Sequence, residues 1–179
     1  MTSDQPQAPS HDVSASELDP SQGNQLQLVT FEVANEEFAV DILAVQEINR
    51  MMDLTRVPAS PPAVEGVINL RGKIIPVMDL RKRFGMPAGD VTDRMRIIVV
   101  EVHSRVIGFI VDSVNEVLRI GSSIVEPAPA MVSSVDTDFI AGVGKLEDRL
   151  LILLDLDTLF DAGLVDSIPQ AAGTQSSAA

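Results

Sequence analysis

The 179-residue sequence contains no cysteine, no tryptophan and no tyrosine. Without cysteine the chain can form no disulfide bond and offers no thiolate metal ligand or cysteine nucleophile. Six phenylalanines are its only aromatic residues, and its net charge is −13. An acidic surface with few stacking side chains repels phosphate backbones, so nucleic acid is not an expected partner.

Long apolar runs are also missing. The longest apolar runs are about as long as "LLILL" (150–154). A membrane-spanning helix needs roughly 20 apolar residues. The first 20 residues have neither a basic start nor an apolar stretch, so they do not form a secretory signal. We therefore expect a cytoplasmic protein without direct membrane insertion.

The sequence offers no arrangement of residues typical of catalysis or of metal binding. "GVGK" (142–145) is similar to part of a phosphate-binding loop, but Leu146 stands where serine or threonine should follow. "DTD" (136–138) and "DLD" (155–157) lack the glycine and glutamate of a calcium loop. We predict no catalytic residues, no metal site, no cofactor and no enzymatic activity.

Both ends of the chain are polar. Residues 1–24 and 162–179 are rich in serine, glutamine, proline, alanine and aspartate, a composition that does not offset the entropy cost of ordering. We expect a disordered leader at 1–24, one folded domain at 25–161 and a disordered tail at 162–179.

The folded region has short segments typical of strands. Residues 26–33 and 36–42 form one predicted hairpin, and residues 96–102 and 105–111 form another. Turns are predicted at Ala34-Asn35 and at His103-Ser104. "DLRKRF" (79–84) and "DLDTLF" (155–160) predict short helices, each capped by its aspartate.

An internal repeat runs through this region. Residues 66–84 match residues 142–160 at a shift of 76, including Gly66 with Gly142, and "VQEI" (45–48) matches "VNEV" (114–117) at a shift of 69. A unit of roughly 65 residues buries little apolar surface alone, so we expect the two copies to pack together. The repeated glycines predict a bulge or a close approach between strands.

The two copies differ at the tip of one predicted hairpin. Arg71-Gly72-Lys73 corresponds to Glu147-Asp148-Arg149, so we expect a similar turn with a different charge, in which Arg71 has no counterpart. A rigidly held arginine in an acidic protein is a candidate contact for a partner's carboxylate or carbonyl groups. A solvated turn residue is the alternative interpretation. Pro76 predicts an edge strand or a bulge, and an edge can accept another protein.

The motifs resemble those of the CheW family of chemotaxis coupling proteins. The resemblance rests on "DILAVQEI" (41–48), "GVINLRGKIIPVMDLRKRF" (66–84), "VDSVNEVLRI" (111–120) and "DFIAGVGKLEDRLLILLDLDTLF" (138–160), and it covers residues 25–161. It implies a mainly β fold of two interleaved, five-stranded SH3-like barrels packed around a shared core. It also implies a non-catalytic adaptor that links a CheA-type histidine kinase, through its CheW-like regulatory domain, to the cytoplasmic tips of methyl-accepting chemoreceptors in membrane-associated arrays.

The resemblance also implies functional residues. Val45, Glu47 and Arg71 correspond to a receptor-binding surface, and Gly66 and Asn69 would support that surface or a kinase contact. Because Val45 and Glu47 recur as Val114 and Glu116, a purely structural role is an alternative for both. For the whole chain, a CheW-like scaffold of gliding or pilus motility is one alternative function, and a β-barrel ligand-binding protein or hydrolase is a more distant one.

Overall fold

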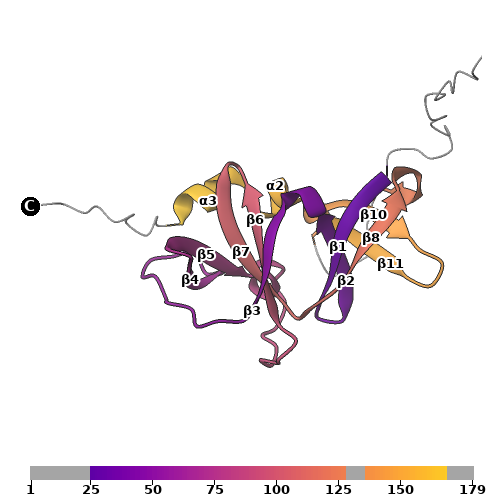
Figure 1. The fold of residues 1–179 in the computed structure, drawn as a ribbon. Coiled ribbons are helices and arrows are strands. Elements are labelled where there is room, and N and C mark those ends of the chain that lie inside the picture. The colour runs from indigo at the N-terminus through magenta and orange to yellow at the C-terminus, as the bar shows by residue number, and fades with distance from the viewer. Residues whose placement is uncertain (1–24, 128–135, 169–179) are drawn as a thin grey trace, which may run out of the picture.

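Eleven β-strands form two sheets in residues 25–127 and 136–168, the part of the chain that the computed structural model describes. The five-stranded sheet has the order β3 (Val45–Arg50), β6 (Arg96–Val102), β7 (Arg105–Val111), β5 (Lys73–Asp79), β4 (Val64–Leu70). The six-stranded sheet has the order β8 (Ser113–Gly121), β1 (Gln25–Val33), β2 (Glu36–Asp41), β11 (Leu150–Leu154), β10 (Ile140–Lys145), β9 (Val125–Glu126). Both sheets are curved and stand side by side (Figure 1). The predicted fold class is confirmed. The six-stranded sheet has one strand more than the five that were predicted, and this strand is the two-residue β9.

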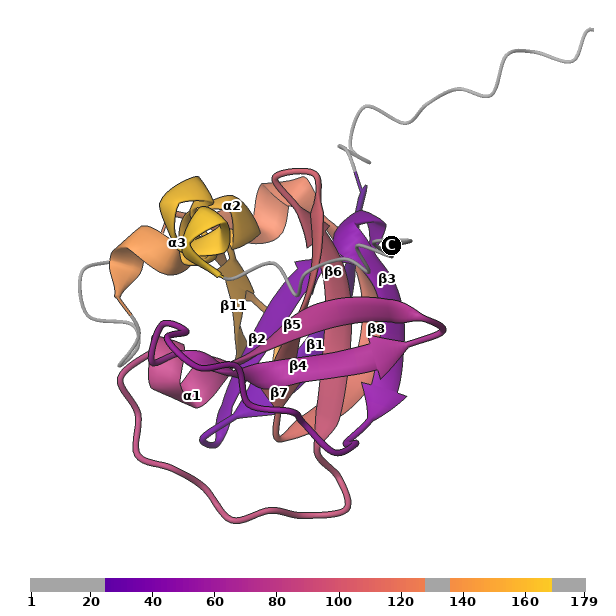
Figure 2. The same cartoon turned by 90° about the vertical axis from the view of Figure 1, so that its left-hand side faces the viewer.

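Each sheet combines strands from both copies of the repeat. The first copy supplies β1–β5 and the second supplies β6–β11, but β1 and β2 pair with strands of the second copy, whereas β6 and β7 pair with strands of the first. Parallel pairing joins β2 to β11 and β5 to β7. Seen from the end of the five-stranded sheet, the β4–β5 hairpin lies in front of β6 and β7 (Figure 2). Neither copy therefore completes a barrel from its own strands.

The predicted turns are formed by residues with left-handed backbone conformations. Ala34 and Asn35 have φ angles of 52° and 67°, and His103 and Ser104 have φ angles of 50° and 62°. Two consecutive left-handed residues are the geometry of a two-residue hairpin turn whose twist matches that of the strands. Both predicted hairpins are confirmed as β1–β2 and β6–β7.

The two copies share the same irregularities of strand pairing. Gln46 of β3 and Asn115 of β8 are each skipped in the register with the neighbouring strand. Glu65 of β4 and Ala141 of β10 are skipped in the same way. These positions correspond at the shifts of 69 and 76 residues, so the repeat seen in the sequence extends to its β-bulges.

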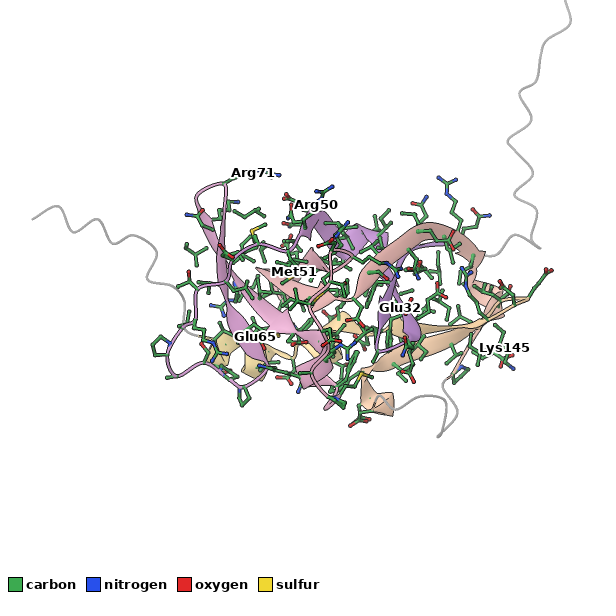
Figure 3. All side chains as sticks on the ribbon, turned by 90° about the horizontal axis from the view of Figure 1, so that it is seen from below. Glu32, Arg50, Met51, Glu65, Arg71 and Lys145 are labelled. Carbon is green, nitrogen blue, oxygen red and sulfur yellow. The ribbon has the colours of Figure 1, made fainter. Side chains whose placement is uncertain are left out.

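Buried apolar side chains form three clusters. One small cluster fills the five-stranded barrel: Ile68, Ile75, Val77, Ile97, Val99 and Ile110. Another fills the six-stranded barrel: Leu28, Ala39, Ile120, Leu151 and Leu153. The third, which we call the central core, is larger than either and takes residues from β1, β2, β6, β7, β11 and the C-terminal helices. Side chains of both sheets fill the space between them (Figure 3). The predicted shared core is confirmed.

All six phenylalanines of the chain lie in one series of ring contacts that crosses the central core. In order along this series they are Phe160, Phe109, Phe31, Phe38, Phe84 and Phe139, with neighbouring ring centroids 5.7, 5.6, 6.0, 5.3 and 6.3 Å apart. These separations are within the range of favourable aromatic pairs. The contact between Phe109 of β7 and Phe31 of β1 connects the two sheets.

Helices are few and short. They are α1 (Leu80–Arg83), α2 (Leu156–Leu159), α3 (Ala162–Ser167) and the 3-10 turns η1 (Ile42–Ala44), η2 (Ser122–Ile124) and η3 (Thr137–Phe139). Asp79 and Asp155 accept hydrogen bonds from the first amides of α1 and α2, as predicted. Among the described residues no helix has the length and apolar character to cross a membrane.

The expected polar tail begins later than predicted. Residues 162–168 form α3 and its C-terminal cap, with Val165 and Ile168 buried in the central core. Asp161 caps this helix through the amide of Leu164 at 2.8 Å. The prediction was wrong here because a single helical turn with two apolar residues has too little periodicity to stand out from polar surroundings. Residues 1–24 and 169–179 lie outside the described residues.

Pro76 does not lie in an outer strand, because β5 runs between β4 and β7. The parallel pairing of β5 with β7 nevertheless starts only at Val77, opposite Gly108. Residues 73–76 of β5 therefore pair with β4 alone, and their edge toward β7 is open. Proline is tolerated because no ladder bond is formed on that side.

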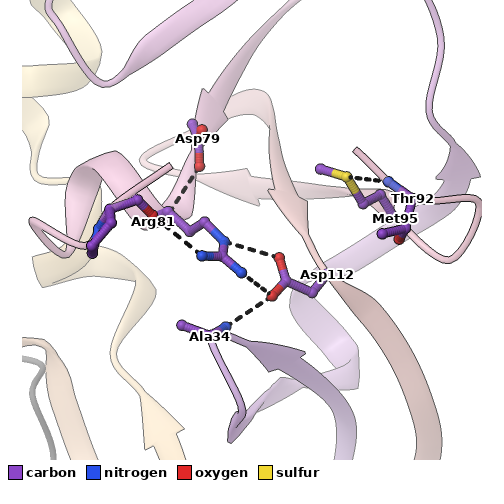
Figure 4. Close-up of polar contacts among 7 residues, drawn as sticks. Ala34, Asp79, Arg81, Thr92, Met95 and Asp112 are labelled. Carbon is purple, nitrogen blue, oxygen red and sulfur yellow. Dashed lines mark hydrogen bonds and ion pairs between the residues drawn. The ribbon is translucent and has the colours of Figure 1, made fainter. Parts of the chain in front are cut away.

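A polar network joins the two sheets at the margin of the central core. Arg81 of α1 donates two hydrogen bonds to Asp112, at 2.6 and 3.1 Å, and the backbone amide of Ala34 donates a third to the same carboxylate at 2.9 Å (Figure 4). Asp112 stands between β7 and β8, and Ala34 belongs to the β1–β2 turn. The hydrogen bonds with Asp112 raise the pKa of Arg81 above its ordinary value. One carboxylate thus ties a helix of one barrel to a turn of the other.

We expect Asp112→Ala to lower the free energy of unfolding by about 2 kcal/mol, because it leaves the half-buried Arg81 guanidinium and the Ala34 amide without their acceptor. Urea denaturation monitored by circular dichroism measures this loss. Glu126→Ala is the control, since it removes an exposed ion pair with Lys145 and should change stability by no more than about 0.5 kcal/mol. Equal losses in the two variants would contradict the role of Asp112.

Candidate protein-binding surface

Arg71 stands at the tip of the β4–β5 hairpin (Figure 3). Arg71 and Gly72 have φ angles of 52° and 82°, so both adopt the left-handed conformation of a two-residue turn. The side-chain oxygen of Asn69 accepts a hydrogen bond from the Gly72 amide at 2.9 Å. Asn69 therefore holds the turn that presents Arg71, which gives it a supporting role.

Glu47 of β3 forms an ion pair with Arg71. The Arg71 Nη2 atom donates to the Glu47 Oε1 atom at 2.7 Å. The Arg71 side chain is 78% exposed and that of Glu47 is 21% exposed, so the pair lies at the rim of the five-stranded barrel. A guanidinium group has five N–H donors, and Glu47 accepts from only one of them in the described structure. The others can bind a carboxylate or carbonyl group of a second protein.

Val45 lies on the other face of β3. It pairs with Val100, whose side chain is in the central core, and it packs against that core itself. Glu47 pairs with Val99, which belongs to the core of the five-stranded barrel. The skipped residue Gln46 causes this change of face. The structure thus brings Glu47 and Arg71 together and separates Val45 from them.

Gly66 is explained by a close approach of the backbone. A Cβ atom at this position would lie 2.6 Å from the carbonyl oxygen of Thr55, whose residue forms a β-bridge with Val67. At the equivalent Gly142 a Cβ atom would lie 2.5 Å from the Val125 side chain and 3.1 Å from the Glu126 carbonyl oxygen, both of β9. The prediction that both glycines serve the backbone is confirmed, and Gly66 supports the hairpin without presenting a side chain.

The six-stranded barrel carries a similar ion pair, which the alignment of the two repeat copies did not predict. Glu116 corresponds to Glu47, and its Oε1 atom accepts from Arg149 Nη2 at 2.6 Å. Arg149 also forms an ion pair with Glu37 at 3.0 Å. Arg71 therefore has a structural counterpart in Arg149, although the residue aligned with it is Glu147. The hydrogen bond with Glu116 raises the pKa of Arg149.

The expectation of the same turn in both hairpins was wrong. Glu147 and Asp148 form the second tip, and neither has a positive φ angle. The Leu146 amide donates to the Arg149 carbonyl at 2.9 Å, which closes this turn without left-handed residues. Because the two turns differ in backbone conformation, the arginine that pairs with Glu116 is Arg149, which aligns with Lys73 and not with Arg71.

Two exposed aliphatic residues on outer strands were also missed. Ile48 of β3 is 40% exposed and Val117 of β8 is 55% exposed. They correspond in the repeat, and each pairs with a central-core residue, Ile98 or Val29. The sequence shows that Ile48 and Val117 follow the repeated glutamates. It does not show the β-bulges that determine which face of the strand each side chain occupies.

The arrangement combines exposed polar and apolar side chains at the rims of the two barrels. Among residues 25–127 and 136–168 no three side chains of the metal-ligating types gather at one place. Burial raises the pKa of Asp79, and nearby Glu65 adds to this effect. Asp79 caps α1 through the Arg81 amide, so its shifted pKa belongs to a structural residue.

Comparisons with known proteins agree with this description. A family model described as a CheW-like domain matches residues 27–163. The chain is 40% identical to Chemotaxis protein CheW of Rhizobium meliloti (strain 1021) and 39% identical to Chemotaxis protein CheW of Bacillus subtilis (strain 168), in each case over 75% of this chain and 86% of the relative. It is also similar to the crystal structure of the scaffolding protein TtCheW from Thermoanaerobacter tengcongensis, with a TM-score of 0.72 and 40% identity over 79% of this chain and 91% of that one.

We expect Gly66→Ala to destabilise the fold by about 2 kcal/mol, because the added Cβ atom forces the Thr55 backbone away. Gly121→Ala is the control, since its Cβ atom would meet only Ser123 at an ordinary 3.5 Å. Thermal unfolding of both variants measures the difference. A Gly66→Ala protein as stable as the parent would contradict the close-approach explanation.

Proposed function

Because the chain belongs to the CheW-like domain family, we propose that it couples methyl-accepting chemoreceptors to a CheA-type histidine kinase. As a member of this family it is a non-catalytic chemotaxis scaffold and not an enzyme. Its work is therefore to hold other proteins in place. The observation that carries the proposal is the exposed Arg71, which pairs with Glu47 of the outer strand β3 and stands in a hairpin turn that Asn69 stabilises.

The receptor contact is proposed along the open edge of β3. On the face of β3 that carries Glu47, Arg71 of the neighbouring hairpin offers free N–H donors. On the opposite face, Ile48 is exposed beside the central core. An amphipathic receptor helix that meets this edge would place apolar side chains on Ile48 and polar groups on Arg71. Val45 would contribute as apolar backing for Ile48, and Glu47 would orient Arg71.

The kinase contact is proposed on the same kind of surface. A CheW-like regulatory domain has the fold of this chain, and the repeat gives each barrel a glutamate–arginine pair at its rim. One chain can therefore contact two partners through similar surfaces on its two barrels. Gly66 and Asn69 would support the contact made by the five-stranded barrel.

We propose that these contacts form at receptor arrays on the cytoplasmic side of the membrane. Each contact would bury roughly 1,200 Å² or less, with the micromolar affinity of transient signalling pairs. Many linked contacts raise the effective concentration and hold the array together. A change in receptor state would reach the kinase as a shift between two arrangements of these contacts.

We expect Arg71→Glu to abolish receptor-dependent kinase activation in reconstituted arrays, because the reversed charge repels the group that Arg71 binds. The far-ultraviolet circular dichroism should not change, since the Arg71 side chain is exposed. Arg94→Glu reverses the charge of an exposed arginine in the loop before β6 and is the control.

A double variant separates a contact from an internal role. Glu47→Arg with Arg71→Glu restores the ion pair with its charges exchanged. If Arg71 binds the receptor, the double variant stays inactive. Recovered activation would show that the pair acts only within the chain, and full activation by the single variant would contradict the proposed function.

A further inference from the structure

A cleft opens where β5 and β7 separate. The two strands pair in parallel over Val77–Asp79 and Gly108–Ile110, but residues 73–76 pair only with β4 and residues 105–107 only with β6. Both strands thus present open backbone edges to the space between them. Figure 2 looks onto the β4–β5 hairpin that forms one side of this space.

The cleft is lined by apolar side chains and has a volume of about 250 Å³. Its lining includes Val67, Ile74, Pro76, Ile107, Val165 and Ile168. Ile107, Val165 and Ile168 belong to the central core, whereas Ile74 is 45% exposed. The volume is below the roughly 300–1,000 Å³ of small-molecule sites. It suits an anchoring side chain better than a cofactor.

Two basic residues stand at this cleft. Lys73 is exposed and forms no ion pair with any described residue. Arg105 donates to the Val165 carbonyl oxygen at 2.6 Å and lies 3.9 Å from the exposed carboxylate of Asp166. A free lysine beside an apolar cleft, in a chain of net charge −13, favours a ligand that carries a carboxylate.

The residues that follow the cleft in sequence lack an aliphatic anchor. Residues 169–179 follow Ile168 directly but contain no leucine, isoleucine, valine, methionine or phenylalanine. Residues 1–24 precede Gln25, which pairs with Gly121 in the six-stranded sheet. Residues 169–179 therefore offer no aliphatic anchor, and the exposed Lys73 favours a partner segment that brings both an anchor and a carboxylate.

We propose that this cleft binds an extended segment of a partner protein, with an aliphatic side chain inserted between β5 and β7 and a carboxylate on Lys73. The open strand edges supply backbone hydrogen bonds, as in other cases where a peptide extends a sheet. The apolar lining favours an aliphatic side chain of the partner segment, and Lys73 favours a carboxylate on the same segment. This proposal does not depend on the proposed receptor and kinase contacts, although the cleft shares the β4–β5 hairpin with Arg71.

The test uses the full chain and two blocked pentapeptides, acetyl-Val-Leu-Val-Asp-Val-amide and its lysine analogue acetyl-Val-Leu-Val-Lys-Val-amide. Amide chemical shifts in NMR titrations report both affinity and location. The aspartate peptide should shift resonances of residues 73–76 and 105–107 and bind at least tenfold more tightly than the lysine peptide. Ile74→Asp should abolish binding. Leu150→Asp is the matched control, because Leu150 corresponds to Ile74 in the repeat and is 52% exposed.

A charge exchange tests Lys73. Lys73→Glu should reverse the preference, so that the lysine peptide binds more tightly, while Arg71→Glu should leave the aspartate peptide bound. No shift at the cleft with either peptide, equal affinity for both, or equal loss in Leu150→Asp would overturn the proposal. Concentration-dependent self-association that Ile74→Asp removes would assign the cleft to a second copy of the chain, and would also overturn it.

Discussion

The contact of the Phe31 ring with the Phe109 ring, 5.6 Å between centroids, connects two sheets that would otherwise each enclose only a small core. Phe31 continues to Phe38, and Phe109 continues to Phe160. A sequence with few aromatic residues thus places all of them in the layer between its barrels. Because this layer is the largest apolar cluster described, burial there supplies most of the hydrophobic stabilisation.

The exchange of hairpins between the repeats makes this layer necessary. Each barrel contains one hairpin from the repeat copy that supplies the other strands of the opposite barrel. Separation of the two copies would therefore break both barrels. Asp112 adds a polar tie at the margin, through Arg81 and the Ala34 amide. The outer strands β3 and β8 therefore belong to two sheets that are joined both by the central core and by this polar network.

Local sequence signals predicted the local structure. The turns at Ala34-Asn35 and His103-Ser104 and the caps at Asp79 and Asp155 depend on residues close in sequence, and they were correct. The repeat predicted equivalent glycines for the same reason. The place of Pro76 inside a sheet depends on strand order, which no local pattern encodes.

The candidate surface was only partly predictable. Arg71 was singled out by its charge, and its partner Glu47 by a family resemblance, but their contact depends on two strands that are not paired with each other. Val45 faces away because Gln46 is skipped in the register, and Arg149 replaces the aligned Glu147 because the second turn has another conformation. Bulges and turn types decide which side chains meet, and they changed the outcome at both barrel rims.

Native-state hydrogen exchange on the full chain tests most directly whether the central core makes the two barrels one cooperative unit. The most slowly exchanging amides of β1 and β2 in one sheet and of β6 and β7 in the other should share one free energy of opening and one dependence on denaturant. Opening of either sheet at a clearly lower free energy, with the other still protected, would contradict this account.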